Sequence, residues 1–131
     1  MKVLALDYGS ARTGVAVSDP TGSVARPLTV VERAASEGGL TRLVEIAEDE
    51  GVERIVVGLP ITLRGEVGEQ ARETEGFLER LRAATRIPVE AYDERFTTSI
   101  ARSSAAQADE DAVAAAHLLS SYLTWLASRP S

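Results

Sequence analysis

The chain has 131 residues, of which 44% are hydrophobic, and this length and composition predict a single globular domain over residues 1–131 with a buried core. It contains no cysteine, which excludes disulfides and thiolate metal sites and is compatible with a reducing compartment. The 20 acidic residues outnumber the 14 basic ones and give a net charge of −6, which excludes a bulk electrostatic attraction to nucleic acid. All basic residues except Lys2 are arginines, whose planar fork binds phosphate, so local clusters remain able to contact a phosphate backbone.

The first residues, MKVLALDYG, carry one Lys and a short apolar run that Asp7 interrupts. This run is too short for a signal peptide or a membrane span. We therefore expect a cytoplasmic protein with no membrane contact.

The first half of the chain predicts three strands and a helix. Two apolar runs, residues 2–7 and 13–18, are joined by a short loop, and residues 24–31 form a third run, which together indicate an antiparallel meander. An apolar stripe then predicts a helix over 37–50, with Gly51 placed as its C-terminal cap.

The second half alternates strands and helices. Residues 54–57 and 89–93 read as strands, 67–85 as an amphipathic helix, and 97–127 as helical with a break near Asp109. The order β-β-β-α-β-α-β-α-α predicts an α/β protein whose five-stranded mixed sheet has helices packed on it.

Three carboxylates are expected to meet in this topology. Asp7 ends the first strand, Glu94 follows the fifth, and Asp111 begins the final helix, and functional groups gather where strands end. Three crowded carboxylates repel one another unless a cation neutralises them, and oxygen ligands of this kind suit Mg²⁺ or Mn²⁺. The implied chemistry is metal-assisted phosphodiester hydrolysis.

Each acid also has a structural interpretation. Asp111 is an acid at a helix start, which the helix dipole favours, and Glu94 beside Arg95 has the form of a surface ion pair. Asp7 is the strongest candidate of the three, because it ends an otherwise apolar strand. Gly9 and Gly14 on either side of the loop leave room for the backbone to turn and for substrate to approach.

Four motifs, spread over nearly the whole chain, carry a family resemblance: LALDYGSARTGVAVSD, IVVGLPITLRGEVGEQA, AYDERFTT and DAVAAAHLLSSYL. In their order and spacing the chain resembles the YqgF-type (RuvX-like) family, described as Holliday-junction-resolvase-like proteins and as pre-16S rRNA nucleases. The resemblance implies a ribonuclease-H-like fold and a divalent-metal-dependent hydrolase that processes the 5′ end of pre-16S rRNA in ribosome biogenesis. It also implies that Asp7, Glu94 and Asp111 are the catalytic, metal-binding set.

The resemblance further implies substrate contacts at Arg12, Arg95, Thr97 and Thr98. Arg12 and Arg95 have two equally supported roles: contact with phosphate, or pairing with Asp7 or Glu94 to keep the acids ionised.

Two departures from the family pattern stand out. Arg64 stands where family members commonly have an acid or an amide, and it supplies positive charge. The segment TTSIARSSAAQADED is short and turns acidic, which puts the usual basic surface in doubt and makes Asp109 or Glu110 a substitute for Asp111, although the register of DAVAAAHLL favours Asp111.

The histidine and the aromatic residues are expected to have structural roles. The single histidine, His117, is turned away from the Asp111 face by helix geometry. Tyr8, Tyr92 and Phe96 suit base stacking, but aromatic residues at strand ends more often pack. Trp125 is expected to pack within the last helix.

Three alternatives to an RNA nuclease stay open. Resolution of branched, four-way DNA needs a homodimer, and the sequence does not choose between monomer and homodimer. Asp-x-Gly between strands also opens the nucleotide-binding domain of sugar kinases and actin-like ATPases, but these need a second domain. The last alternative is a nucleic-acid-binding module of weak or no catalytic activity.

Overall fold

The computed structural model describes residues 1–59, 69–93 and 107–128. Its elements, in chain order, are β1 (Val3–Asp7), β2 (Arg12–Ser18), β3 (Ala25–Glu32), α1 (Glu37–Glu50), β4 (Arg54–Leu59), α2 (Glu69–Ala84), β5 (Val89–Asp93) and α3 (Gln107–Ser128).

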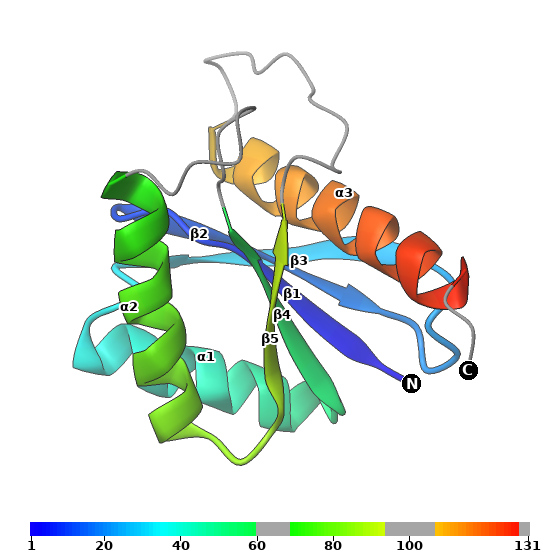
Figure 1. Cartoon of the computed structure of the whole chain (residues 1–131), viewed down its shortest axis with the longest axis horizontal. Helices are drawn as coiled ribbons and strands as arrows, with labels where there is room; N and C mark the ends of the chain where they lie inside the picture. The colour runs from blue at the N-terminus through cyan, green and yellow to red at the C-terminus, as the bar shows by residue number, and fades with distance from the viewer. Residues whose placement is uncertain (60–68, 94–106, 129–131) are drawn as a thin grey trace.

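The strands form one mixed sheet in the order β3-β2-β1-β4-β5 (Figure 1). β2 pairs antiparallel with β1 and β3, whereas β1, β4 and β5 run parallel. The carboxyl ends of these three parallel strands therefore lie along one edge of the sheet, and β1 ends there at Asp7. The predicted mixed five-stranded α/β sheet is confirmed.

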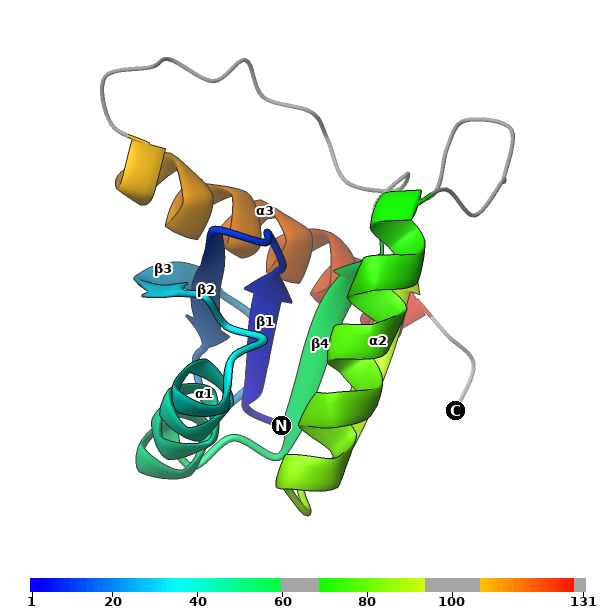
Figure 2. The same cartoon turned by 90° about the vertical axis from the view of Figure 1, so that its left-hand side faces the viewer.

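The helices cover the sheet on both faces, with α1 and α2 on one side and α3 on the other (Figure 2). Side chains alternate between the faces along each strand. In β1, Leu4 and Leu6 join the core beneath α1 and α2, and Val3 and Ala5 join the core beneath α3. The same alternation assigns Asp7 to the α3 face.

Helix α1 begins and ends where its sequence signals indicate. The Ser36 hydroxyl accepts a hydrogen bond from the Gly39 amide at 3.0 Å and caps the N-terminus. Gly51 adopts the left-handed conformation, with φ of 67°, and closes the C-terminus. The predicted range 37–50 is confirmed.

The final helix differs from the expectation. α3 runs unbroken from Gln107 through Asp109 to Ser128, so the predicted break near Asp109 is wrong. Acidic residues in the first turns stabilise a helix through its dipole. The alanine-rich stretch that follows has high helix propensity. The helical expectation for 97–106, like the start of the second helix at 67, falls outside the described residues.

Candidate functional site

Asp7 lies at the carboxyl end of β1, on the face that α3 covers. Its partner in the antiparallel ladder is Gly14 of β2, and its side chain is partly buried. A residue at the end of a paired strand is held on a rigid element, which suits a group that must be positioned accurately.

Gly14 allows α3 to approach the sheet closely enough to reach this point. A Cβ on Gly14 would collide with the main-chain carbonyl oxygen of Asp111. The backbone of α3 is thus in direct contact with β2 at the residue paired with Asp7. The structure brings Asp7 and Asp111 to the same end of the sheet, and α3 fills the space beside Gly14 that we had expected substrate to use.

Asp111 is nearly buried, with 8% of the residue exposed, and it carries an ion pair. Arg12 Nε lies 3.2 Å from Asp111 Oδ2, and the Arg12 side chain is 39% exposed. The sequence predicts Asp7 as the acid to pair with Arg12 near the first strand, whereas the structure pairs it with Asp111. A carboxylate with so little access to water needs a nearby cation or several hydrogen bonds to stay charged.

Tyr8 directly follows Asp7, and its side chain packs on the other face of the sheet, as expected for consecutive residues of an extended chain. Its ring stacks on Phe77 of α2, with a centroid separation of 4.4 Å and an interplanar angle of 19°. Its hydroxyl donates to Glu73 Oε1 at 3.1 Å, and burial together with this carboxylate raises the pKa of Tyr8. The packing role expected for Tyr8 is confirmed.

Tyr92 of β5 packs against α3, and Trp125 lies within that helix. Tyr92 is buried, its hydroxyl is 2.9 Å from Ser121 Oγ, and its ring packs edge-on against Tyr122 at 5.5 Å. Trp125 packs against both tyrosines, and its packing role is confirmed. His117 is exposed, as helix geometry predicts, and Phe96 lies outside the described residues.

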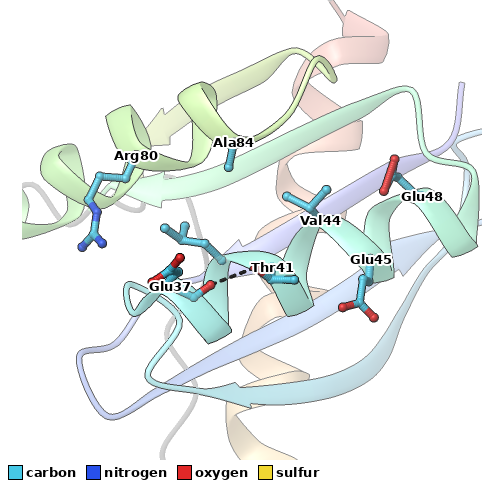
Figure 3. Close-up of a pocket in the computed structure, with 8 residues that line it drawn as sticks. Glu37, Thr41, Val44, Glu45, Glu48, Arg80 and Ala84 are labelled. Carbon is cyan, nitrogen blue, oxygen red and sulfur yellow. Dashed lines mark hydrogen bonds between the residues drawn. The ribbon is translucent and has the colours of Figure 1, made fainter.

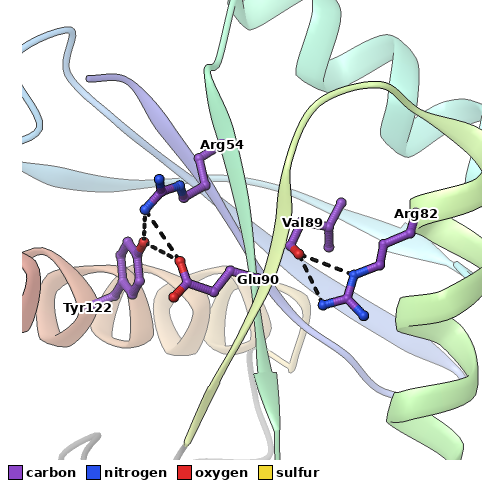
Figure 4. Close-up of polar contacts among 5 residues, drawn as sticks. All are labelled: Arg54, Arg82, Val89, Glu90 and Tyr122. Carbon is purple, nitrogen blue, oxygen red and sulfur yellow. Dashed lines mark hydrogen bonds and ion pairs between the residues drawn. The ribbon is translucent and has the colours of Figure 1, made fainter.

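A second polar cluster on the α3 face was not foreseen from the sequence (Figure 4). Arg54 Nη1 donates to the Tyr122 hydroxyl at 2.8 Å, and that hydroxyl donates to Glu90 Oε2 at 2.7 Å. Arg54 and Glu90 also form an ion pair of 3.4 Å. Burial raises the pKa of Tyr122, whereas the bond to Tyr122 raises the pKa of Arg54.

This cluster belongs to packing and not to the candidate site. Arg54 begins β4, so it lies at the opposite end of the sheet from Asp7, the last residue of β1. In the same view, Arg82 of α2 donates through Nε and Nη2 to the Val89 carbonyl oxygen, both at 3.2 Å, and covers part of edge strand β5 (Figure 4).

A groove of about 490 Å³ lies on the other face, between α1 and α2 (Figure 3). The Thr41 hydroxyl donates to the Glu37 carbonyl oxygen at 3.0 Å within this groove. Its lining is Glu37, Leu40, Thr41, Val44, Glu45, Glu48, Arg80 and Ala84. None of the predicted site residues is among them, so the groove is separate from the carboxylates.

The remaining predicted residues are Glu94, Arg64, Arg95, Thr97 and Thr98, and all five lie outside the described residues. Within the described ranges, no three acidic, histidine or cysteine side chains are grouped so as to hold a metal ion. The two described carboxylates, Asp7 and Asp111, are hard oxygen donors of the type that Mg²⁺ and Mn²⁺ prefer. The oxygen donors of Asp7 and Asp111 therefore fit Mg²⁺ and Mn²⁺. Among the same residues, no helix is both long and apolar enough to span a bilayer.

Comparison with known proteins decides the family. The family model described as "RuvX: Holliday junction resolvase" matches residues 1–125. The chain belongs to the RuvX family. The sequence resemblance is thereby confirmed over nearly the whole chain.

Curated RuvX relatives are similar in length and sequence. A protein of Desulforudis audaxviator, named "Putative pre-16S rRNA nuclease", is 41% identical, with 94% of each chain covered. Proteins of the same name from Rubrobacter xylanophilus and Chloroflexus aurantiacus are 45% and 38% identical, covering 93% and 98% of this chain and 91% and 90% of theirs. Membership in this family supports nuclease function and assigns the chain to the hydrolases.

Solved structures support the fold. RuvC of Thermus thermophilus, in complex with a Holliday junction substrate, superposes with a TM-score of 0.60 at 20% identity, covering 100% of this chain and 99% of that one. The fowlpox virus resolvase bound to Holliday junction DNA gives 0.51 at 10% identity, with 96% and 99% covered. The RuvX chain thus has the ribonuclease-H-like fold of these resolvases, as predicted.

Proposed function

We propose that this RuvX protein is a divalent-metal-dependent nuclease, acting as one domain in the cytoplasm, that hydrolyses phosphodiester bonds in RNA and processes the 5′ end of pre-16S rRNA. The names of its relatives support the substrate. The observation that carries the proposal is the convergence of Asp7 and Asp111 where α3 contacts Gly14. Two acids brought together on one sheet face need a structural or a chemical reason, and the family membership favours chemistry.

We assign the metal-binding and catalytic role to Asp7, Asp111 and Glu94, the residue that follows β5 in the sequence. These residues would hold Mg²⁺ or Mn²⁺. When bound, such a cation activates a water molecule and stabilises the leaving oxygen of the phosphodiester. The protein holds Asp7 on a strand end and Asp111 on a helix fixed against the sheet, and such rigid elements suit groups that must be positioned accurately.

We assign substrate contact to Arg12, Arg64, Arg95, Thr97 and Thr98. Arginine forks suit phosphate oxygens, and threonine hydroxyls donate single hydrogen bonds to them. Arg12 is the described member of this set, and its partly exposed side chain lies beside Asp111. Phosphate contact at this position brings the substrate backbone next to the carboxylates.

Substitution of the acids tests the proposal. Cleavage of precursor rRNA fragments by Asp7→Asn and Asp111→Asn, in Mg²⁺ or Mn²⁺, should fall by more than about 100-fold, because loss of a metal ligand exceeds the effect of losing its supporting partner. The control is Asp49→Asn, an exposed acid of α1 on the other face, which should cleave as wild type does. Wild-type rates in Asp7→Asn, with contaminating nuclease excluded, would overturn the catalytic assignment of Asp7, and no cleavage by the wild-type protein would leave a nucleic-acid-binding module without activity.

The family model's description favours one second candidate, cleavage of four-way DNA junctions. Resolution of a junction requires two active sites related by two-fold symmetry, hence a homodimer. Parallel assays on precursor rRNA, single-stranded RNA and four-way DNA, with the mass of the protein in solution measured by light scattering, separate the two. Preferred cleavage of the DNA junction by a dimer would replace RNA processing as the function.

A further inference from the structure

The ion pair between Arg12 and Asp111 joins two side chains of very different freedom. The Asp111 side chain is 11% exposed, and its own main chain is in contact with β2 at Gly14. The Arg12 side chain is 39% exposed, on a long and flexible stem. Asp111 is therefore the fixed partner, and Arg12 is the partner that has room to leave.

The same pair also places a positive charge where the proposed metal must bind. A nearly buried carboxylate is destabilised if it loses its counter-charge. In the protein without metal, Arg12 supplies that charge from 3.2 Å. A divalent cation on Asp111 supplies more positive charge, and at the short distances involved it repels the guanidinium.

We propose that Arg12 is a built-in counter-cation of Asp111 that competes with the divalent metal ion and so lowers the metal affinity of the free protein. This inference rests on the proposed function, because it takes Asp111 as a metal ligand. It gives Arg12 a role in the metal-free protein, charge compensation for Asp111 before the metal arrives, in addition to the phosphate contact proposed above. The opposite possibility, that Arg12 aids metal binding by orienting Asp111, is an outcome of the test.

Calorimetric titration with Mn²⁺, without nucleic acid, measures this competition directly. Arg12→Gln should bind Mn²⁺ about tenfold more tightly than wild type, since one repelling charge is removed within a few ångströms of the ion. Arg12→Lys keeps the charge and should bind within about threefold of wild type, far from the tenfold gain.

A matched control removes an arginine from another ion pair. Arg26 Nη2 lies 3.6 Å from Glu50 Oε1, and the Arg26 side chain is 58% exposed. Arg26→Gln changes the net charge of the protein by the same amount, away from Asp111. Its Mn²⁺ affinity should equal that of wild type, which separates a local effect from an overall change in charge.

The outcomes distinguish this inference from the proposed function. Equal or weaker Mn²⁺ binding by Arg12→Gln, shown by thermal melting to be folded, overturns the competition. Unchanged Mn²⁺ binding by Asp7→Asn and Asp111→Asn instead overturns the metal site itself, and the competition with it. Tighter binding by Arg12→Gln together with weaker binding by both acid variants supports both proposals.

Discussion

Gly14 lies where the sheet, the final helix and the two described carboxylates meet. A glycine inside a strand is unfavourable because it lacks a side chain to pack, and it often marks a close approach of another backbone. Here that backbone is α3 at Asp111, while Asp7 is the ladder partner of Gly14. The geometry of the site therefore depends on a residue that carries no functional group.

Adding a methyl group at this position should force α3 away from the sheet. Gly14→Ala should lower the free energy of unfolding by about 1–3 kcal/mol, as overpacking does in a close-packed interior, and the obstructing atoms are main-chain atoms that cannot rotate away. Urea unfolding measures the change. The control is Gly76→Ala in α2, where a Cβ meets nothing within 4 Å, and alanine should add about 0.5–1 kcal/mol to the stability of the helix. Equal stabilities of Gly14→Ala and wild type would contradict the close contact.

Single residues differ in how far the sequence predicts them. Asp7 was predicted because it interrupts an apolar strand, and its position at a strand end is confirmed. The pairing of Arg12 with Asp111 was not predicted, because it depends on how α3 lies across the sheet, and no local pattern of either residue encodes that. The catalytic roles of Asp7, Glu94 and Asp111 remain proposals.

Helix α3 is fixed to the sheet by polar contacts at two levels. Asp111 contacts Arg12 near its start, and Tyr122, about three turns further on the same side, contacts Arg54 and Glu90 (Figure 4). Ala115 and Leu118 between them are buried against the sheet. The helix is thus held in both position and direction, which keeps Asp111 over Gly14.

Alkaline pH should loosen the Tyr122 contact. Burial raises the pKa of Tyr122 above the value of about 10 that an unfolded tyrosine has. The unfolded chain then loses this proton at lower pH than the folded protein, so the stabilising effect is complete below about pH 10 and is lost as pH rises through the folded value. Tyr122→Phe should be less stable than wild type by about 1 kcal/mol at pH 7, and the difference should shrink above pH 10.

Denaturant unfolding from pH 7 to 11 measures this effect. The fluorescence of Trp125, the single tryptophan, reports on helix α3, in which Tyr122 lies. Trp125 packs 5.7 Å from Tyr122, so its emission should change in Tyr122→Phe. Tyr8→Phe is the matched control, since burial also raises the pKa of Tyr8 but its ring packs on α2; the Trp125 emission should then stay as in wild type. A stability difference for Tyr122→Phe that is independent of pH would contradict the assignment.

Elements with local start and stop signals were predicted most accurately. The range of α1 was predicted from an apolar stripe and Gly51, and the strand over 89–93 from its position after Pro88. The predicted break in the last helix failed because the acidic run at Asp109 resembles a loop, whereas acids also stabilise the first turn of a helix. The choice between these readings depends on packing against the sheet, which the sequence does not show.

The two faces of the sheet differ in what they carry. The α3 face carries the described carboxylates at the edge where the parallel strands end, and the other face carries the groove between α1 and α2 (Figures 2 and 3). With a net charge of −6, the protein as a whole repels nucleic acid. The proposed binding of RNA must therefore depend on a small number of arginines that contact phosphate directly.

This arrangement predicts a weak salt dependence of RNA binding. Without metal Arg12 stays paired with Asp111, so with phosphate contacts from Arg64 and Arg95 log K against log salt should have a slope of roughly −1.4 for a single strand, far shallower than for proteins with basic grooves. Fluorescence anisotropy in EDTA, from about 50 to 200 mM salt, measures the slope without cleavage.

Arg64→Gln or Arg95→Gln should each reduce the magnitude of the slope by about 0.7, to a similar extent for all RNA sequences. Arg42→Gln on α1, an arginine of the opposite face with a side chain 57% exposed, removes the same charge and should leave the slope unchanged. A slope that falls equally in all three variants would show that RNA binding depends on the net charge of the protein and not on direct contacts from Arg64 and Arg95.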